Sequence, residues 1–185
     1  MKTVIFNVET DKQELPGVAY GVFGIKDGEV EVLGISKTAN AGVNTVANTV
    51  LDMCQAAAKA DALIAFGLIL HWQTLAEYLR QNARAEAADA LGAAVKRNGM
   101  CALELSQGYC RLERWPKLNE VYNAFYDDEC MPDNLLATAK VIAAIAAKRQ
   151  PDLSAFPSWK FWLSDADYDD ADHDDVKSTY SEKNQ

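Results

Sequence analysis

The chain has 185 residues, of which 49% are hydrophobic, 24% charged and 9% aromatic, and its formal net charge is −9. This length and composition are typical of one globular domain with its own core, and they exclude a wholly disordered or collagen-like chain. The strongly apolar stretches 62–70 and 141–147 are far shorter than the roughly 20 residues that cross a bilayer. We therefore expect a soluble protein without a signal peptide or a membrane partner.

The cysteines and histidines limit the chemistry further. Four cysteines without a Cys-x-x-Cys pair favour a reduced, cytoplasmic protein. Only two histidines are present, His71 and His173, which argues against a histidine-rich zinc site.

The first predicted elements are three strands. Residues 3–8 and 17–25 are rich in β-branched and apolar side chains, and residues 29–32 alternate polar with apolar ones, as a half-exposed strand does. The pair Asp27–Gly28 is a typical two-residue hairpin turn. An antiparallel meander is therefore expected.

Helices and two further strands follow the meander. Apolar residues recur at helical spacing over 43–59, and 62–66 is a short apolar run that predicts a buried strand. The remaining predictions are helices over 72–80 and 84–96, a strand over 100–105, and helices from Pro116 to Tyr126 and from Pro132 to near Arg149. Since parallel strands need crossover connections, this order predicts the α/β class, with a mixed five-stranded sheet flanked by helices.

Composition divides the chain into three parts. Residues 1–150 are assigned to the folded domain, 151–163 to an aromatic extension and 164–185 to an acidic tail expected to be disordered. The tail carries a net charge of −6 and the rest of the chain −3. This balance lacks the basic surface that accompanies binding to a phosphate backbone.

Several stretches, in this order, resemble the DEDDh 3′-to-5′ exonucleases. Residues 4–10 (VIFNVET) are similar to the first exonuclease motif, residues 100–105 (MCALEL) and 114–126 (RWPKLNEVYNAFY) to a strand and the segment after it, and 135–141 (LLATAKV) to the last helix. The resemblance spans residues 3–147 and implies a ribonuclease H-like fold. It also implies phosphodiester hydrolysis by two divalent cations held by four carboxylates, with a histidine as general base.

Only one of the five catalytic positions carries the residue that the resemblance implies. Glu9 is retained, but Asn7 and His71 stand at the first two Asp positions, Glu129 at the His position and Asn134 at the last Asp position. One anionic ligand cannot offset two divalent cations beside a phosphate. The sequence therefore predicts a catalytically inactive exonuclease-like protein without a metal cofactor.

Two alternatives remain open. A metal site rebuilt from Glu9 with Asp127, Asp128, Glu129 or Asp133 would make the chain an active exonuclease that uses Mg²⁺ or Mn²⁺. Asp133 cannot simply replace Asn134, because one step along a helix turns the side chain by about 100°. A nucleic-acid-binding module would instead need a positive groove, for which the candidates are Arg80, Arg84, Lys96, Arg97, Arg111, Arg114 and Lys117.

The C-terminal segment is the expected contact with a protein partner of nucleic-acid metabolism. Aromatic side chains beside acidic ones are typical of docking segments, and a row of carboxylates can imitate a phosphate backbone and occupy a basic cleft. The predicted contact residues are Phe156, Trp159, Phe161, Trp162, Asp165, Asp167, Asp169 and Asp170. A packed aromatic lid with a solvated tail is the alternative, as a partly buried helix-start histidine is for His71.

Overall fold

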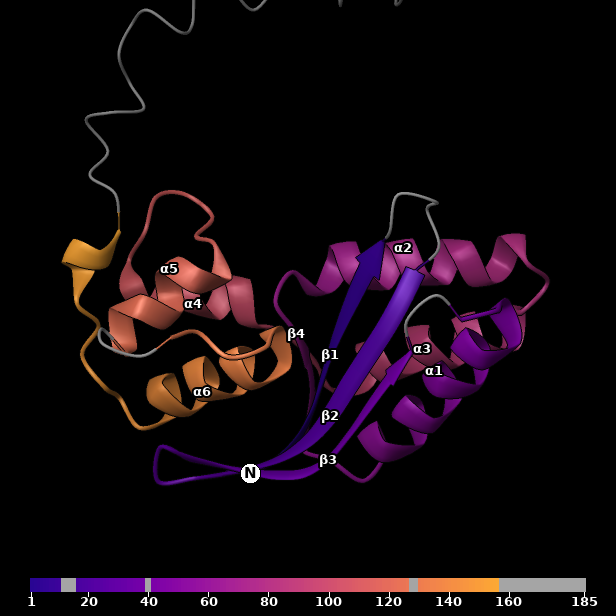
Figure 1. Ribbon diagram of the computed structural model, residues 1–185, viewed down its shortest axis with the longest axis horizontal. Helices are drawn as coiled ribbons and strands as arrows, with labels where there is room; N and C mark the ends of the chain where they lie inside the picture. The colour runs from indigo at the N-terminus through magenta and orange to yellow at the C-terminus, as the bar shows by residue number, and fades with distance from the viewer. Residues whose placement is uncertain (11–15, 39–40, 127–129, 157–185) are drawn as a thin grey trace, which may run out of the picture. The chain divides into compact units, whose positions relative to one another are not determined.

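Five strands form one mixed sheet in the computed structural model (Figure 1). The strands are β1 (Lys2–Thr10), β2 (Pro16–Lys26), β3 (Glu29–Thr38), β4 (Ala62–Ala65) and β5 (Gly99–Cys101), in the spatial order β3-β2-β1-β4-β5. β2 is antiparallel to both β1 and β3, whereas β4 is parallel to both β1 and β5. The predicted α/β class, with a meander followed by parallel strands, is confirmed.

The structure describes residues 1–10, 16–38, 41–126 and 130–156. Within this range, Met1–Ala155 form one compact unit, to which the following description applies. The described residues include no helix that is both long and apolar enough to span a membrane.

Helices cover both faces of the sheet (Figure 1). One face carries α1 (Val43–Ala57), α2 (Leu68–Gln81) and α3 (Ala85–Asn98). The other carries α4 (Ala102–Cys110), α5 (Leu118–Phe125) and α6 (Asn134–Ala146), followed by the short helix η1 (Leu153–Ala155).

The alternation of side chains along β1 builds a core on each face. Val4, Phe6 and Val8 are buried against α1, α2 and α3, whereas Ile5 is buried with residues of α6. This follows from the period of two in a strand, which sends successive side chains to opposite faces. An apolar run buried on both sides therefore fixes the strand at the centre of the sheet.

The prediction of a strand over 100–105 is wrong beyond Cys101. β5 pairs with β4 only over Gly99–Cys101, because β4 itself ends at Ala65. Residues after Cys101 have no neighbouring strand to bond with, and they satisfy their backbone groups by forming α4 instead. The Ser106 hydroxyl donates to the Ala102 carbonyl oxygen at 2.6 Å within this helix.

Three helix starts also differ from the prediction. α5 begins at Leu118 rather than Pro116, because Lys117 and Glu120 form its capping box. α2 begins at Leu68 rather than Trp72, because Gly67 adopts a left-handed conformation (φ 89°) that turns the chain directly out of β4. α6 begins at Asn134 rather than Pro132, because the side chain of Asp133 caps it.

Candidate functional site

Two of the predicted site residues meet in a small cavity at the carboxyl end of β1. Asn7 comes from β1, and Asn134 is the first residue of α6. The cavity has a volume of about 130 Å³, and its lining residues are Phe6, Asn7, Phe66, Leu118, Asn134 and Thr138. Among the described residues, its polar lining side chains are two amides and one hydroxyl, none of which is ionisable.

Glu9 lies beside this cavity and is held by Asn7. The two residues are two positions apart on β1 and therefore share a face of the strand. The Asn7 amide Nδ2 donates a hydrogen bond to Glu9 Oε1 at 2.9 Å. Two carboxylates at this separation would repel each other unless a cation lay between them, whereas an amide donor satisfies the glutamate directly.

Asp133 has a structural role. Its Oδ1 accepts hydrogen bonds from the backbone N–H groups of Leu135 and Leu136 at 3.0 and 3.2 Å. Its Oδ2 lies 3.5 Å from Lys37 Nζ. Asp133 is thus the N-cap of α6, while its neighbour Asn134 lines the cavity, which agrees with the rotation expected between adjacent helix positions.

His71 lies in the first turn of α2 and contacts Phe66 and Phe6, which both line the cavity. Its Nε2 is 3.0 Å from the carbonyl oxygen of Phe66, and its ring meets that of Phe6 edge-on with centroids 6.3 Å apart. Burial lowers the pKa of His71, and the hydrogen bond with Phe66 opposes this only in part. His71 is therefore neutral at pH 7, and Nε2–H donates to the carbonyl. Its environment agrees with the alternative of a partly buried helix-start histidine.

Most of the predicted partner-binding residues lie outside the described residues. This holds for Trp159, Phe161, Trp162, Asp165, Asp167, Asp169 and Asp170, and also for Glu129 of the catalytic set. Phe156 is described, and its side chain is buried.

The loop before α5 is more highly organised than the sequence suggested. The Arg114 guanidinium donates to both carboxylate oxygens of Glu120, each at 2.9 Å. Glu120 Oε2 also accepts from the backbone N–H of Lys117 at 2.8 Å. The signal that could have identified this loop is a Glu three residues after the helix cap, the pattern of a capping box.

Three members of the candidate basic groove are engaged with their own chain. Arg114 pairs with Glu120, Arg80 with Asp89 at 3.3 Å, and Arg84 hydrogen-bonds Asn44. Arg114 and Arg80 are therefore paired with carboxylates of the same chain, whereas Arg84 keeps its charge beside a neutral amide.

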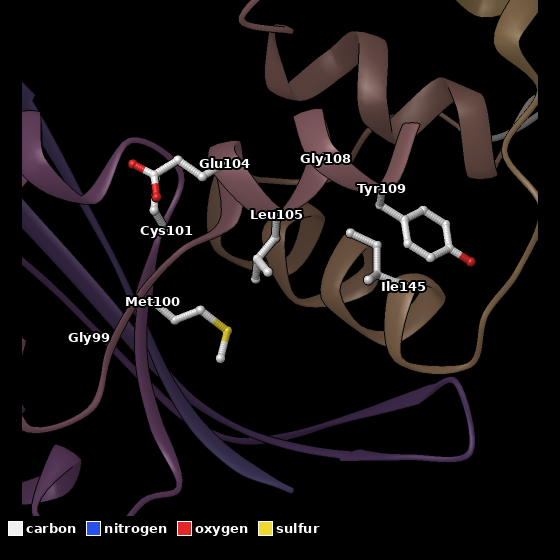
Figure 2. A pocket seen from close by; sticks show the side chains of 8 residues that line it. All are labelled: Gly99, Met100, Cys101, Glu104, Leu105, Gly108, Tyr109 and Ile145. Atoms are coloured by element: carbon white, nitrogen blue, oxygen red, sulfur yellow. The ribbon is translucent and has the colours of Figure 1, made fainter. Parts of the chain in front are cut away.

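A larger and more apolar hollow lies elsewhere, next to β5. It measures about 570 Å³. Figure 2 shows Met100, Leu105 and Ile145 extending toward it from β5, α4 and α6. None of the described residues predicted as catalytic lines this hollow. The Tyr109 hydroxyl at its margin donates to the Arg149 carbonyl oxygen at 2.9 Å.

Among the described residues, the end of β1 offers few anionic oxygens, while Asp127, Asp128 and Glu129 of the alternative metal site lie outside the described residues. A pair of divalent cations needs several anionic oxygens, and the carboxylate of Glu9 already accepts a hydrogen bond from Asn7. Both oxygens of Asp133 are engaged at the cap of α6. Within the described part of the chain, no three His, Cys, Asp or Glu side chains gather as metal ligands would.

Comparison with protein-family models, curated proteins and solved structures found no match for this chain.

Proposed function

We propose that the chain is an exonuclease-like domain of the ribonuclease H-like class that no longer hydrolyses phosphodiesters and acts by binding a protein of nucleic-acid metabolism. The antiparallel meander followed by parallel strands supports the fold part of this proposal, because it is the arrangement that the resemblance implies. The functional part depends on the end of β1.

The hydrogen bond from Asn7 to Glu9 is the observation that carries the loss of catalysis. An exonuclease of this class would place two carboxylates here around a shared cation. In this chain the amide N–H occupies the position from which a cation would neutralise Glu9. Removal of such electrostatic groups costs several kcal/mol of transition-state stabilisation, so little turnover is expected.

The surroundings of the cavity support binding to a protein. Ile69 and Leu70 are exposed in the first turn of α2, and Trp115 is exposed just before α5. Because β4 is parallel to β1, the start of α2 lies at the same end of the sheet as Asn7. The Arg114–Glu120 pair holds the loop that presents Trp115. An exposed Trp on a fixed loop and exposed aliphatic side chains are both typical of protein contacts.

A nuclease assay tests the loss of catalysis. The full chain and the Glu9→Gln variant are incubated with labelled single-stranded DNA and RNA in the presence of Mn²⁺. We expect the same background cleavage from both proteins. Robust trimming by the natural chain that disappears in Glu9→Gln would show that a metal site has been rebuilt.

Affinity capture tests the binding function. The full chain, a chain ending at residue 163 and the Trp115→Ala variant are compared as baits, with Leu153→Ala as a control for another exposed apolar side chain. We expect a captured protein to be retained by the control and lost from the truncated chain. Loss from Trp115→Ala alone would place the contact at the cavity rather than in the tail.

A further inference from the structure

The outer edge of the sheet at β3 is long and has exposed apolar side chains near its middle. β3 has ten residues and pairs on one side only with a strand of the described chain, β2. Its side chains Val32, Leu33 and Ile35 are 47, 50 and 47% exposed. Free backbone N–H and C=O groups beside exposed apolar side chains are a template for another strand.

A bulge in β3 decides which strand fits this edge. Phe23 is opposite Val32 and Val22 is opposite Gly34, so Leu33 is an extra residue without a partner on β2. A bulge of this kind usually protects an edge, because a regular strand loses its register with the bulged one. A strand with the same bulge is the partner that keeps register on both sides of the irregularity.

The bulge also places Val32 and Ile35 on one face of the sheet. Val32 lies opposite Phe23, which is buried in the core beneath α6. Beyond the bulge, Lys37 contacts Asp133, the N-cap of α6, and therefore faces the α6 side. Ile35 is two positions before Lys37 on β3 and shares its face of the sheet. Although Val32 and Ile35 are three residues apart in sequence, both side chains therefore face the α6 side.

We propose that a second copy of this chain pairs antiparallel with β3, with Val32 opposite Ile35 of the second copy and the two bulges facing each other at the twofold axis. In this register Val30 lies opposite Lys37, Glu31 opposite Ser36 and Glu29 opposite Thr38. Each of these pairs combines residues from the same face of the sheet. No like charges oppose each other. The exposed Val32 of each copy packs against Ile35 of the other, so the twofold axis repeats this apolar contact.

Charge sets the conditions under which this dimer forms. Each copy carries a net charge of −9, so the two copies repel each other at long range. Salt screens that repulsion without weakening apolar contacts. The association of the natural chain is therefore expected to strengthen as the ionic strength rises.

Sedimentation of the full chain over a range of concentrations tests the proposal. We expect a monomer–dimer equilibrium that Val32→Lys and Ile35→Lys each weaken at least tenfold, because both place an ammonium group in an apolar contact. Leu153→Lys, at a comparably exposed apolar residue of η1, should leave it unchanged. A natural chain that stays monomeric at every concentration, or a dimer that survives both β3 variants, overturns the proposal.

Disulfide trapping tests the register. In a chain whose exposed Cys130 is replaced by Ser, Val32→Cys and Ile35→Cys are prepared separately and then mixed under mild oxidation. We expect rapid cross-linking of the mixture and little of either protein alone. Because of the bulge, positions 32 and 35 are as far apart along the strand as Phe23 and Gly21 of β2, which is about 6.6 Å at roughly 3.3 Å per residue. With the spacing between strands added, two copies of position 32 would lie about 8 Å apart, too far for a disulfide. Equal cross-linking of Val32→Cys alone contradicts this register.

Discussion

Glu120 and Glu9 both lie near the protein surface, but the groups that hydrogen-bond their carboxylates differ. Glu120 is clamped by both nitrogens of the Arg114 fork and by a backbone N–H, and the loop around it is fixed. Glu9 is exposed and meets a single amide hydrogen bond from Asn7. The charged pair of Glu120 therefore fixes a loop, whereas Glu9 at the end of β1 has an amide as its described hydrogen-bond partner. Packing and electrostatics thus vary separately, because a fold does not by itself imply the charges of a catalytic site.

Glu120→Gln should destabilise the fold more than any substitution at the end of β1. It leaves the half-buried Arg114 without its counter-charge and should lower the free energy of unfolding by about 2 kcal/mol. Glu113→Gln, at an exposed glutamate of the same loop, should change it by less than about 0.5 kcal/mol. Urea unfolding of the three proteins measures the difference, and equal stabilities would show that the clamp is not structural.

The same variant should show a particular pH dependence. Burial would raise the pKa of Glu120, but the hydrogen bonds from Arg114 and Lys117 outweigh it and hold that pKa below its usual range. The stabilisation is thus present above the unfolded pKa, near 4.3, and is lost as the pH falls through the lower folded value. The difference in the free energy of unfolding between the natural chain and Glu120→Gln should therefore disappear at acidic pH.

Asn7→Asp should come next, with a loss of about 1.5 kcal/mol. It removes the hydrogen bond to Glu9 and places a like charge beside it. Because two adjacent carboxylates form a cation site, Mn²⁺ should restore part of the loss in this variant and leave the natural chain unchanged. Thermal unfolding with and without Mn²⁺ measures both effects, and Asn48→Asp on α1 is the control. Equal responses to Mn²⁺ would refute the role assigned to Glu9.

Asp133 distinguishes a helix cap from a metal ligand. Asp133→Ala should cost about 1 kcal/mol because α6 loses its cap, while Asp133→Asn should cost much less because Asn caps helices equally well. Chemical denaturation of both variants provides the measurement. If Asp133→Asn were as unstable as Asp133→Ala, the negative charge would matter more than the cap.

His71 should give the smallest effect, visible as a change of slope with pH. Since burial lowers its pKa in the folded state, the unfolded chain binds the proton more readily as the pH falls below about 6.5. Stability is therefore lost on acidification through this range and regained as the pH rises. The free energy of unfolding of His71→Phe, measured by urea unfolding, should change less between neutral and mildly acidic pH than that of the natural chain. A variant with the same slope would mean that another group causes it.

The sequence predicted the elements that are specified by a local pattern of residues. It did not predict features that depend on contacts with another part of the chain. The buried runs of β1 and β2 and the helical spacing of α1 identified these elements directly. The end of β5 could not be predicted, because it depends on the length of β4 in a different part of the chain. The side chains of Asn7 and Asn134 were selected by resemblance, but Phe66, Leu118 and Thr138 carry no signal that would place them in the same cavity.

The central claim is that the end of β1 cannot hold a pair of divalent cations. Calorimetric titration of Mn²⁺ into the full chain and into Glu9→Gln tests it most directly. We predict that the two titrations are indistinguishable. Two Mn²⁺ ions bound per natural chain, both lost in Glu9→Gln, would contradict it.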